Sequence, residues 1–168
     1  MDRLKKLFET KDKDILSVYF TAGFPQRDST AEVIRSLESH GADMIEVGVP
    51  FSDPMADGKV IQQSSTVALR NGMTLDLLLS QVEEARRDCE IPLVLMGYLN
   101  PMMRYGVERL FKRCGEVGID AIIIPDLPFG EYMEHYKPLC QQYGIPIIML
   151  ITLSLIHISE PTRHAQIS

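Results

Sequence analysis

The sequence predicts an α/β fold in which parallel strands alternate with helices. Short apolar runs alternate with amphipathic segments along most of the 168 residues. The runs are nearly continuous rather than apolar at every second position, which is typical of strands covered on both faces. Residues that start and stop helices stand between the runs. Repeated βα units of this kind form either a doubly wound sheet or a (β/α)₈ barrel, and hydrophobic periodicity alone does not choose between them.

The first two strands are expected at residues 15–21 and 43–49, which are mainly apolar and partly β-branched. Between them, Ser29 stands three residues before Glu32 in the pattern of a capping box, which predicts the start of a helix. Gly41 predicts the end of that helix. The chain is therefore expected to open with a strand, a helix and a second strand.

The same alternation continues to residue 151. Thr74 is expected to cap a helix, Gly118 and Gly144 each to end one, and Pro138 to bend the last. The expected helices are 60–70, 75–88, 107–117 and 131–143, and the further strands are 91–98, 119–124 and 145–151.

Composition argues against several classes of function. The apolar share of 45% and the charged share of 24% are ordinary for a globular protein. The net charge of −6, without a block of Lys and Arg, argues against a nucleic-acid or anionic membrane surface. We expect no membrane span and no secretion signal, because no apolar stretch has the required length. Cys89, Cys114 and Cys140 are far apart, which indicates reduced cytoplasmic thiols rather than a disulfide framework or a metal site.

Two carboxylates mark the C-terminal end of the strand at 43–49. Glu46 lies in the strand and Asp57 in the loop that follows. Both candidate architectures bind ligands at this edge of the sheet, and two acids in different surroundings can divide acid and base work. The alternative is a paired core acid with a turn-forming aspartate. No Gly-x-Gly-x-x-Gly or P-loop pattern follows the first strand, which argues against a dinucleotide site.

Four motifs occur in order at the expected strand ends. They are Thr21-Ala22-Gly23-Phe24-Pro25, Glu46-Val47-Gly48-Val49-Pro50-Phe51-Ser52-Asp53-Pro54-Met55-Ala56-Asp57-Gly58, Met96-Gly97-Tyr98-Leu99-Asn100-Pro101 and Pro125-Asp126-Leu127-Pro128. Together they closely resemble the signature of the tryptophan synthase α-subunit family, and the resemblance covers residues 1 to about 152.

The resemblance implies an α/β (β/α)₈ TIM barrel, of which residues 1–152 would be the N-terminal part, truncated after about five βα strands. It implies a cytoplasmic lyase of tryptophan biosynthesis that cleaves indole-3-glycerol phosphate to indole and glyceraldehyde 3-phosphate by a retro-aldol reaction. No cofactor or metal is expected in this chain. Pyridoxal phosphate is expected in a β-subunit partner, within a heterotetramer of two α and two β subunits.

The resemblance also implies roles for single residues. Glu46 matches the acid/base, and Asp57 matches the carboxylate that accepts a hydrogen bond from the indole N–H and stabilises the cationic tautomer. Tyr19, Ile61 and Tyr98 match positions that line the indole pocket. Tyr19 is a departure, because many relatives carry Phe there, so its hydroxyl needs a partner or access to water.

Residues on two expected loops resemble the surface that faces the β subunit. They are Asp53, Pro54, Asn100 and Pro101. A non-catalytic docking partner of a β subunit would keep these loops without Glu46 or Asp57, whereas both acids are present. Another phosphosugar barrel enzyme would typically need a Lys or Cys acid at a strand end, and no strand here ends in Lys.

The βα pattern stops after Thr152, and residues 153–168 resemble the translation of a sequencing adapter. We therefore expect a non-native tail, the alternative being a genuine divergent C-terminus. A complete barrel needs about 250 residues, with the phosphate site usually built by loops after strands seven and eight. A polypeptide of these 168 residues alone is accordingly expected to be poorly stable and close to inactive.

Overall fold

The computed structural model describes residues 3–54 and 56–150. The strands are β1 (Ser17–Thr21), β2 (Met44–Gly48), β3 (Leu93–Met96), β4 (Ala121–Ile123) and β5 (Ile147–Ile148). The helices are α1 (Arg3–Thr10), α2 (Thr30–Ser39), α3 (Lys59–Arg70), α4 (Leu75–Ala85), α5 (Leu99–Tyr105), α6 (Val107–Val117), α7 (Phe129–Glu131), the π-helical η1 (Tyr132–Tyr136) and α8 (Lys137–Tyr143). The expected tail at 153–168 lies outside the described residues.

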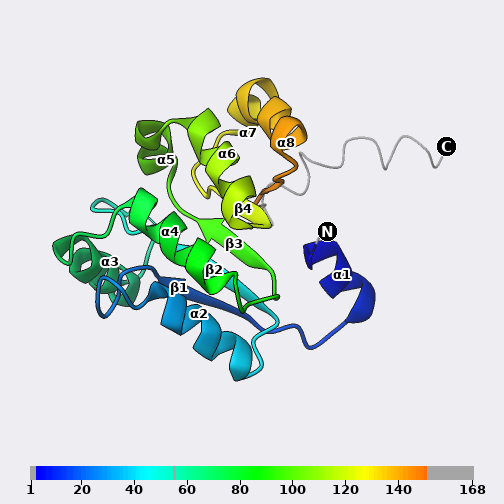
Figure 1. Cartoon of the computed structure of the whole chain (residues 1–168). Helices are drawn as coiled ribbons and strands as arrows, with labels where there is room; N and C mark the ends of the chain where they lie inside the picture. Colours follow the sequence, from blue (N-terminus) through cyan, green and yellow to red (C-terminus); the bar gives the residue numbers. More distant parts are fainter. Residues whose placement is uncertain (1–2, 55, 151–168) are drawn as a thin grey trace.

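The five strands form one parallel sheet in the order β1-β2-β3-β4-β5. Each strand therefore pairs with the next one along the chain, and the strand order never reverses. A doubly wound sheet contains such a reversal, whereas successive units of a (β/α)₈ barrel do not. The α/β prediction is confirmed, and the winding is that of a barrel. Figure 1 shows α2 and α4 side by side on one face of this sheet.

Both faces of the sheet are covered by apolar side chains. On the helix side, Ile45 and Leu95 are fully buried in the main core. On the inner side, Val94 and Ile123 form a second cluster, against which Leu4 of α1 packs. Because neighbouring residues of a strand point to opposite faces, burial on both sides requires continuous apolar runs.

The predicted capping box is wrong. Ser29 does precede α2, but its backbone is already helical, and its hydroxyl donates to the carbonyl oxygens of Phe24 and Gln26 at 3.0 and 2.7 Å. The first helical amide, that of Thr30, instead donates to Gln81 Oε1 of α4 at 3.2 Å. A side chain from a distant helix therefore caps α2 at its first turn.

Other local signals are confirmed. Thr74 Oγ1 accepts a hydrogen bond from the Leu77 amide at 3.2 Å and caps α4. Gly118 and Gly144 adopt left-handed conformations with φ of 82° and 68° at the ends of α6 and α8. Pro138, where a bend is expected, lies in the first turn of α8, directly after the π-helical η1. The sequence reasoning missed α1 and α5.

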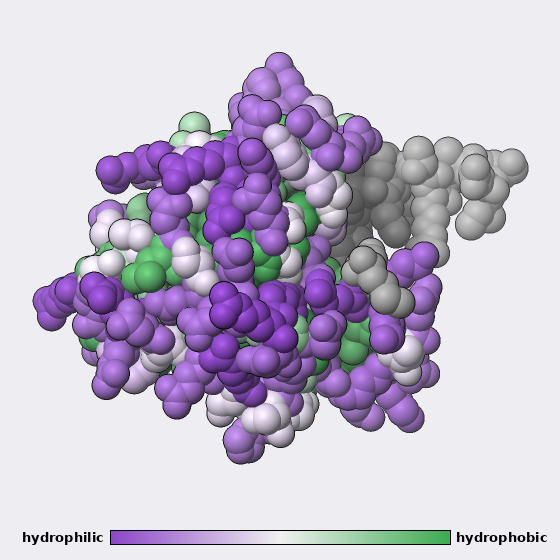
Figure 2. All heavy atoms as spheres, viewed as in Figure 1, coloured by the Kyte–Doolittle hydropathy of each residue, from purple (hydrophilic) through white to green (hydrophobic). Residues whose placement is uncertain are grey.

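Within the described ranges, none of the helices has the length and apolar character needed to cross a membrane. The view in Figure 2, on the helix side, presents mainly hydrophilic residues with apolar ones showing between them. This surface agrees with the amphipathic pattern of the helices.

The three cysteines are free thiols, as predicted, and they differ in exposure. Burial raises the pKa of Cys114 to about 12 and that of Cys89 to about 11, and both side chains are inaccessible.

Since the thiolate is the reactive form, at pH 8 we expect a thiol-specific reagent to modify half-buried Cys140 first. Absorbance from an aromatic disulfide reagent should report at most one fast thiol in the native chain and three in urea. Fast labelling of Cys114, located by peptide mass, would contradict this.

Candidate active site

Glu46 points to the inner face of the sheet, away from the packed helices. Its neighbours Ile45 and Val47 belong to the helix-side core, whereas Met44, two residues before it, belongs to the inner cluster. The Glu46 carboxylate is half-buried and accepts a hydrogen bond from Ser17 Oγ at 2.7 Å. Sequence reasoning missed Ser17, because its proximity to Glu46 depends on the register between β1 and β2.

Tyr19 lies directly opposite Glu46 in that register. Its ring leans over Gly48, where a Cβ atom would come within 2.7 Å of Tyr19 Cε2. The absence of a side chain at Gly48 therefore makes room for the phenol of Tyr19. Burial is the main cause that raises the pKa of Tyr19, a hydrogen bond with Thr21 opposes it, and the charges of Asp57 and Glu46 add to the rise. The phenol is thus close enough to interact with both carboxylates.

Asp57 is half-buried in the loop between β2 and α3. Gln62 Nε2 donates to its backbone oxygen at 2.9 Å, and its side chain lies close enough to the Tyr98 hydroxyl to raise the pKa of that phenol. The same hydroxyl accepts a hydrogen bond from the Ala56 amide at 3.1 Å. Burial, followed by the neighbouring Asp57, raises the pKa of Tyr98, which therefore stays neutral and can donate to the carboxylate at pH 7. The structure thus brings Tyr19, Tyr98 and both acids to one edge of the sheet.

Ile61 is less closely tied to this cluster. It lies in the first turn of α3, is half-buried, and its backbone oxygen accepts a hydrogen bond from Ser64 Oγ at 2.9 Å. Its place in an indole pocket stays a prediction.

The residues expected at a partner surface lie on two segments that approach each other. These residues are Asp53, Pro54, Asn100 and Pro101. The first two lie in a loop as expected, but the loop predicted for Asn100 and Pro101 is wrong, because they lie in the first turn of α5. Proline is tolerated there, and the first amide, that of Leu99, donates to Asp126 Oδ1 at 2.8 Å.

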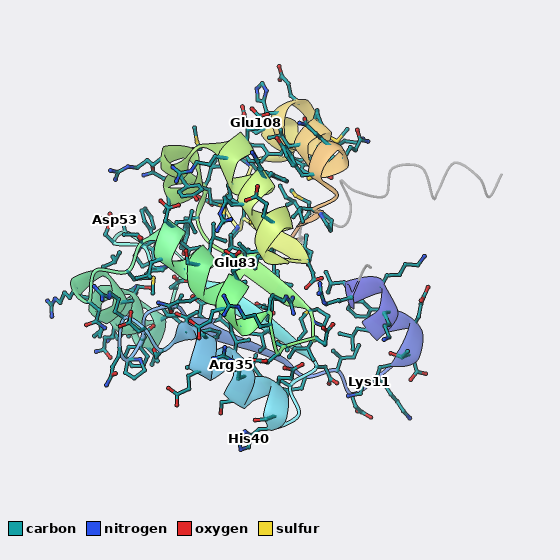
Figure 3. The ribbon with its side chains drawn as sticks, viewed as in Figure 1. Lys11, Arg35, His40, Asp53, Glu83 and Glu108 are labelled. Carbon is teal, nitrogen blue, oxygen red and sulfur yellow. The ribbon has the colours of Figure 1, made fainter. Side chains whose placement is uncertain are left out.

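A groove of about 520 Å³ runs between these two segments. It is lined by Pro50, Phe51 and Ser52 on one side and by Asn100, Pro101 and Arg104 on the other. The Phe51 ring packs on Tyr98 with the centroids 5.4 Å apart, so the groove adjoins the cluster around Asp57. In Figure 3, Asp53 lies at the end of the molecule near α3 and α5, far from Lys11 beside α1.

The cluster offers two carboxylates and two phenols as its titratable groups. In the part of the chain that the structure describes, no three His, Cys, Asp or Glu side chains are arranged to hold a metal ion. The carboxyl and phenol groups of the cluster can transfer protons and form hydrogen bonds at the carboxyl ends of β1 to β3.

Several known proteins of similar sequence share one description. The profile of the family described as "Tryptophan synthase alpha chain" matches residues 5–161. The tryptophan synthase alpha chain of Bacteroides fragilis is 55% identical over 152 residues, which are 90% of this chain and 58% of the relative. That of Bacteroides thetaiotaomicron is 57% identical, over 90% of this chain and 59% of the relative. The chain thus spans less than two thirds of the length of these relatives.

Solved structures agree in fold. Tryptophan synthase subunit alpha from Legionella pneumophila superposes with a TM-score of 0.82 at 37% identity, over 88% of this chain and 57% of that one. Tryptophan synthase from M. tuberculosis superposes with a TM-score of 0.84 at 30% identity, over 90% of this chain and 62% of that one. The tryptophan synthase complex from Pyrococcus furiosus superposes with a TM-score of 0.76 at 39% identity, over 82% of this chain and 56% of that one. The fold and the extent of the sequence match lead to one conclusion: the chain belongs to the tryptophan synthase alpha chain family.

Proposed function

We propose that this chain provides the acid/base residues for the cleavage of indole-3-glycerol phosphate to indole and glyceraldehyde 3-phosphate. The observation that carries the proposal is that Glu46 lies opposite Tyr19 in the sheet register and that Asp57 lies in the loop after β2, held there by Gln62, at the sheet edge where barrel enzymes bind their substrates. A carboxyl group that can gain and lose a proton and a second carboxylate that accepts a hydrogen bond are what this reaction needs.

The proposed reaction begins with a proton transfer from Glu46 to C3 of the indole. Without it, breaking the carbon–carbon bond would expel a poor carbanion. Asp57 accepts a hydrogen bond from the indole N–H and stabilises the resulting cation, and Tyr98 holds the Asp57 carboxylate in place. Glu46, now ionised, takes the proton of the glycerol hydroxyl while the bond breaks, which releases indole and the aldehyde. Ser17 orients Glu46 for both steps.

The proposed partner is a tryptophan synthase β subunit, two of which would assemble with two copies of the α subunit. The solved relative from Pyrococcus furiosus is described as a complex. Asp53, Pro54, Asn100 and Pro101 lie on the segments that form the groove beside Tyr98, so a partner seated there would contact both sides of the cluster. No cofactor is assigned to this chain, and the pyridoxal phosphate belongs to the β subunit in this proposal.

The test uses a chimaera in which residues 1–150 are joined to the remainder of the Bacteroides fragilis relative. We expect it to release indole from indole-3-glycerol phosphate, and Asp57→Asn to lower kcat by about 10²–10³-fold through loss of electrostatic stabilisation. Asp28→Asn, an exposed aspartate beside Arg27, is the matched control and should leave the rate unchanged. A folded chimaera that releases no indole would refute the proposal. The 168-residue polypeptide alone should stay close to inactive.

A further inference from the structure

A buried pair of hydroxyl groups joins β1 to α3. Thr21 Oγ1 and Ser64 Oγ lie 2.6 Å apart, and the two residues are 4% and 8% exposed. Thr21 is the last residue of β1, and Ser64 lies in the second turn of α3. Burying a hydroxyl group without a partner is unfavourable, so each of these groups depends on the other.

The pair is the centre of a longer chain of hydrogen bonds. Ser64 Oγ donates to the backbone oxygen of Ile61 at 2.9 Å, and Thr21 lies close enough to the Tyr19 hydroxyl to oppose the rise that burial causes in the pKa of that phenol. Each hydroxyl has a single hydrogen. If Ser64 donates to Ile61, then Thr21 donates to Ser64.

The helix at the far end of this chain also holds the loop of Asp57. Gln62 in the first turn of α3 donates to the backbone oxygen of Asp57 at 2.9 Å. The position of α3 against β1 therefore sets the position of Asp57 relative to Tyr19. The Thr21–Ser64 hydrogen bond fixes that position from within the core.

We propose that Thr21 and Ser64 are positioning residues, whose hydrogen bond locks α3 to β1 and so sets the place of the Asp57 carboxylate beside Tyr19. The link to ligand binding rests on the proposed function, whereas the link to the Asp57 loop does not. Neither residue contacts the reacting atoms in this proposal, and both act through α3.

The first test is amide hydrogen exchange in the chimaera, followed by NMR. Ser64→Ala and Thr21→Val each remove one hydroxyl group at nearly constant volume. We expect each to speed the exchange of the Ala56 amide, which donates to Tyr98, by about fivefold, as for the loss of one hydrogen bond. Ser65→Ala is the matched control, since Ser65 is buried in the same helix but lies outside this chain of bonds. Unchanged exchange in both variants, or an equal rise in Ser65→Ala, would overturn the proposal.

The second test measures indole affinity. The chain contributes six tyrosines but no tryptophan, so the fluorescence of added indole can be followed without a tryptophan background from these residues. We expect Ser64→Ala to weaken binding about fivefold, and to have no effect in an Asp57→Asn background, because the group that it positions is then altered. An equal loss in both backgrounds would overturn the role in positioning Asp57. If the folded chimaera releases no indole while the exchange effects are present, the proposed function fails and the positioning role stands.

Discussion

Replacing Arg86 by Met is expected to lower the free energy of unfolding by about 3–5 kcal/mol, because it removes the closest and most buried cationic partner of a buried carboxylate. Arg86 and Asp120 pair directly, and their side chains are only 7% and 6% exposed. The guanidinium also donates to the backbone oxygens of Gly118 at 2.8 Å and Ile91 at 2.6 Å. Asp120 in turn accepts hydrogen bonds from the Leu93 amide at 2.9 Å and from Arg3 at 3.2 Å. One buried ion pair thus joins α1, α4, β3 and the start of β4.

Urea unfolding followed by circular dichroism measures this effect. Arg109→Met is the matched control, since it removes an ion pair with Asp76 in which both side chains are 60% exposed, and it should cost less than about 1 kcal/mol. If Arg86→Met does not fold, Arg86→Lys can be measured instead, because it keeps the charge but loses the planar set of donors. Its loss of unfolding free energy should lie between the losses expected for Arg109→Met and Arg86→Met. A loss of unfolding free energy in Arg86→Met no larger than that in Arg109→Met would show that the Arg86–Asp120 pair does not stabilise the packing of α1, α4, β3 and β4.

Features set by neighbouring residues could be predicted from the sequence. The apolar runs located all five strands, because burial on both faces leaves a continuous signal. The predicted strands were longer than the observed ones, as at 15–21 against Ser17–Thr21, because apolar side chains continue past the last ladder hydrogen bonds. The predictions that Thr74 caps α4 and that Gly118 ends α6 were correct, since a cap depends on residues within one turn.

Features set by distant residues could not be predicted. The capping box of Ser29 failed because Gln81, from another helix, supplies the acceptor. Ser17 reaches Glu46 across 29 residues, and Arg86 reaches Asp120 across 34. Short-range patterns carry no information about such pairs, which depend on sheet register and helix packing. Glu46 and Asp57 were placed at the correct edge because the carboxyl ends of parallel strands share that edge.

Replacing Glu46 by Gln in the chimaera should abolish most of the cleavage of indole-3-glycerol phosphate. One proton transfer by a positioned side chain is commonly worth about 10²–10⁴-fold in rate, and Glu46 would serve two transfers in turn. Glutamine keeps the size and can still accept a hydrogen bond from Ser17, but it cannot exchange a proton. We therefore expect kcat to fall by about 10³–10⁴-fold with little change in the stability of the fold.

Glu32→Gln provides the matched control, because Glu32 is an exposed glutamate in the first turn of α2. Release of indole, measured by its fluorescence, should be unchanged in that variant. The comparison with Asp57→Asn distinguishes the roles of the two acids. Asp57→Asn removes a charge that only stabilises the cation, so the reaction should be slower but should keep the same dependence on pH. Loss of the group that carries the proton should remove the ionisation itself from the pH profile. If Glu46→Gln retained that ionisation, the proton would be carried by another group, and the two tyrosines beside Asp57 would be the next to test.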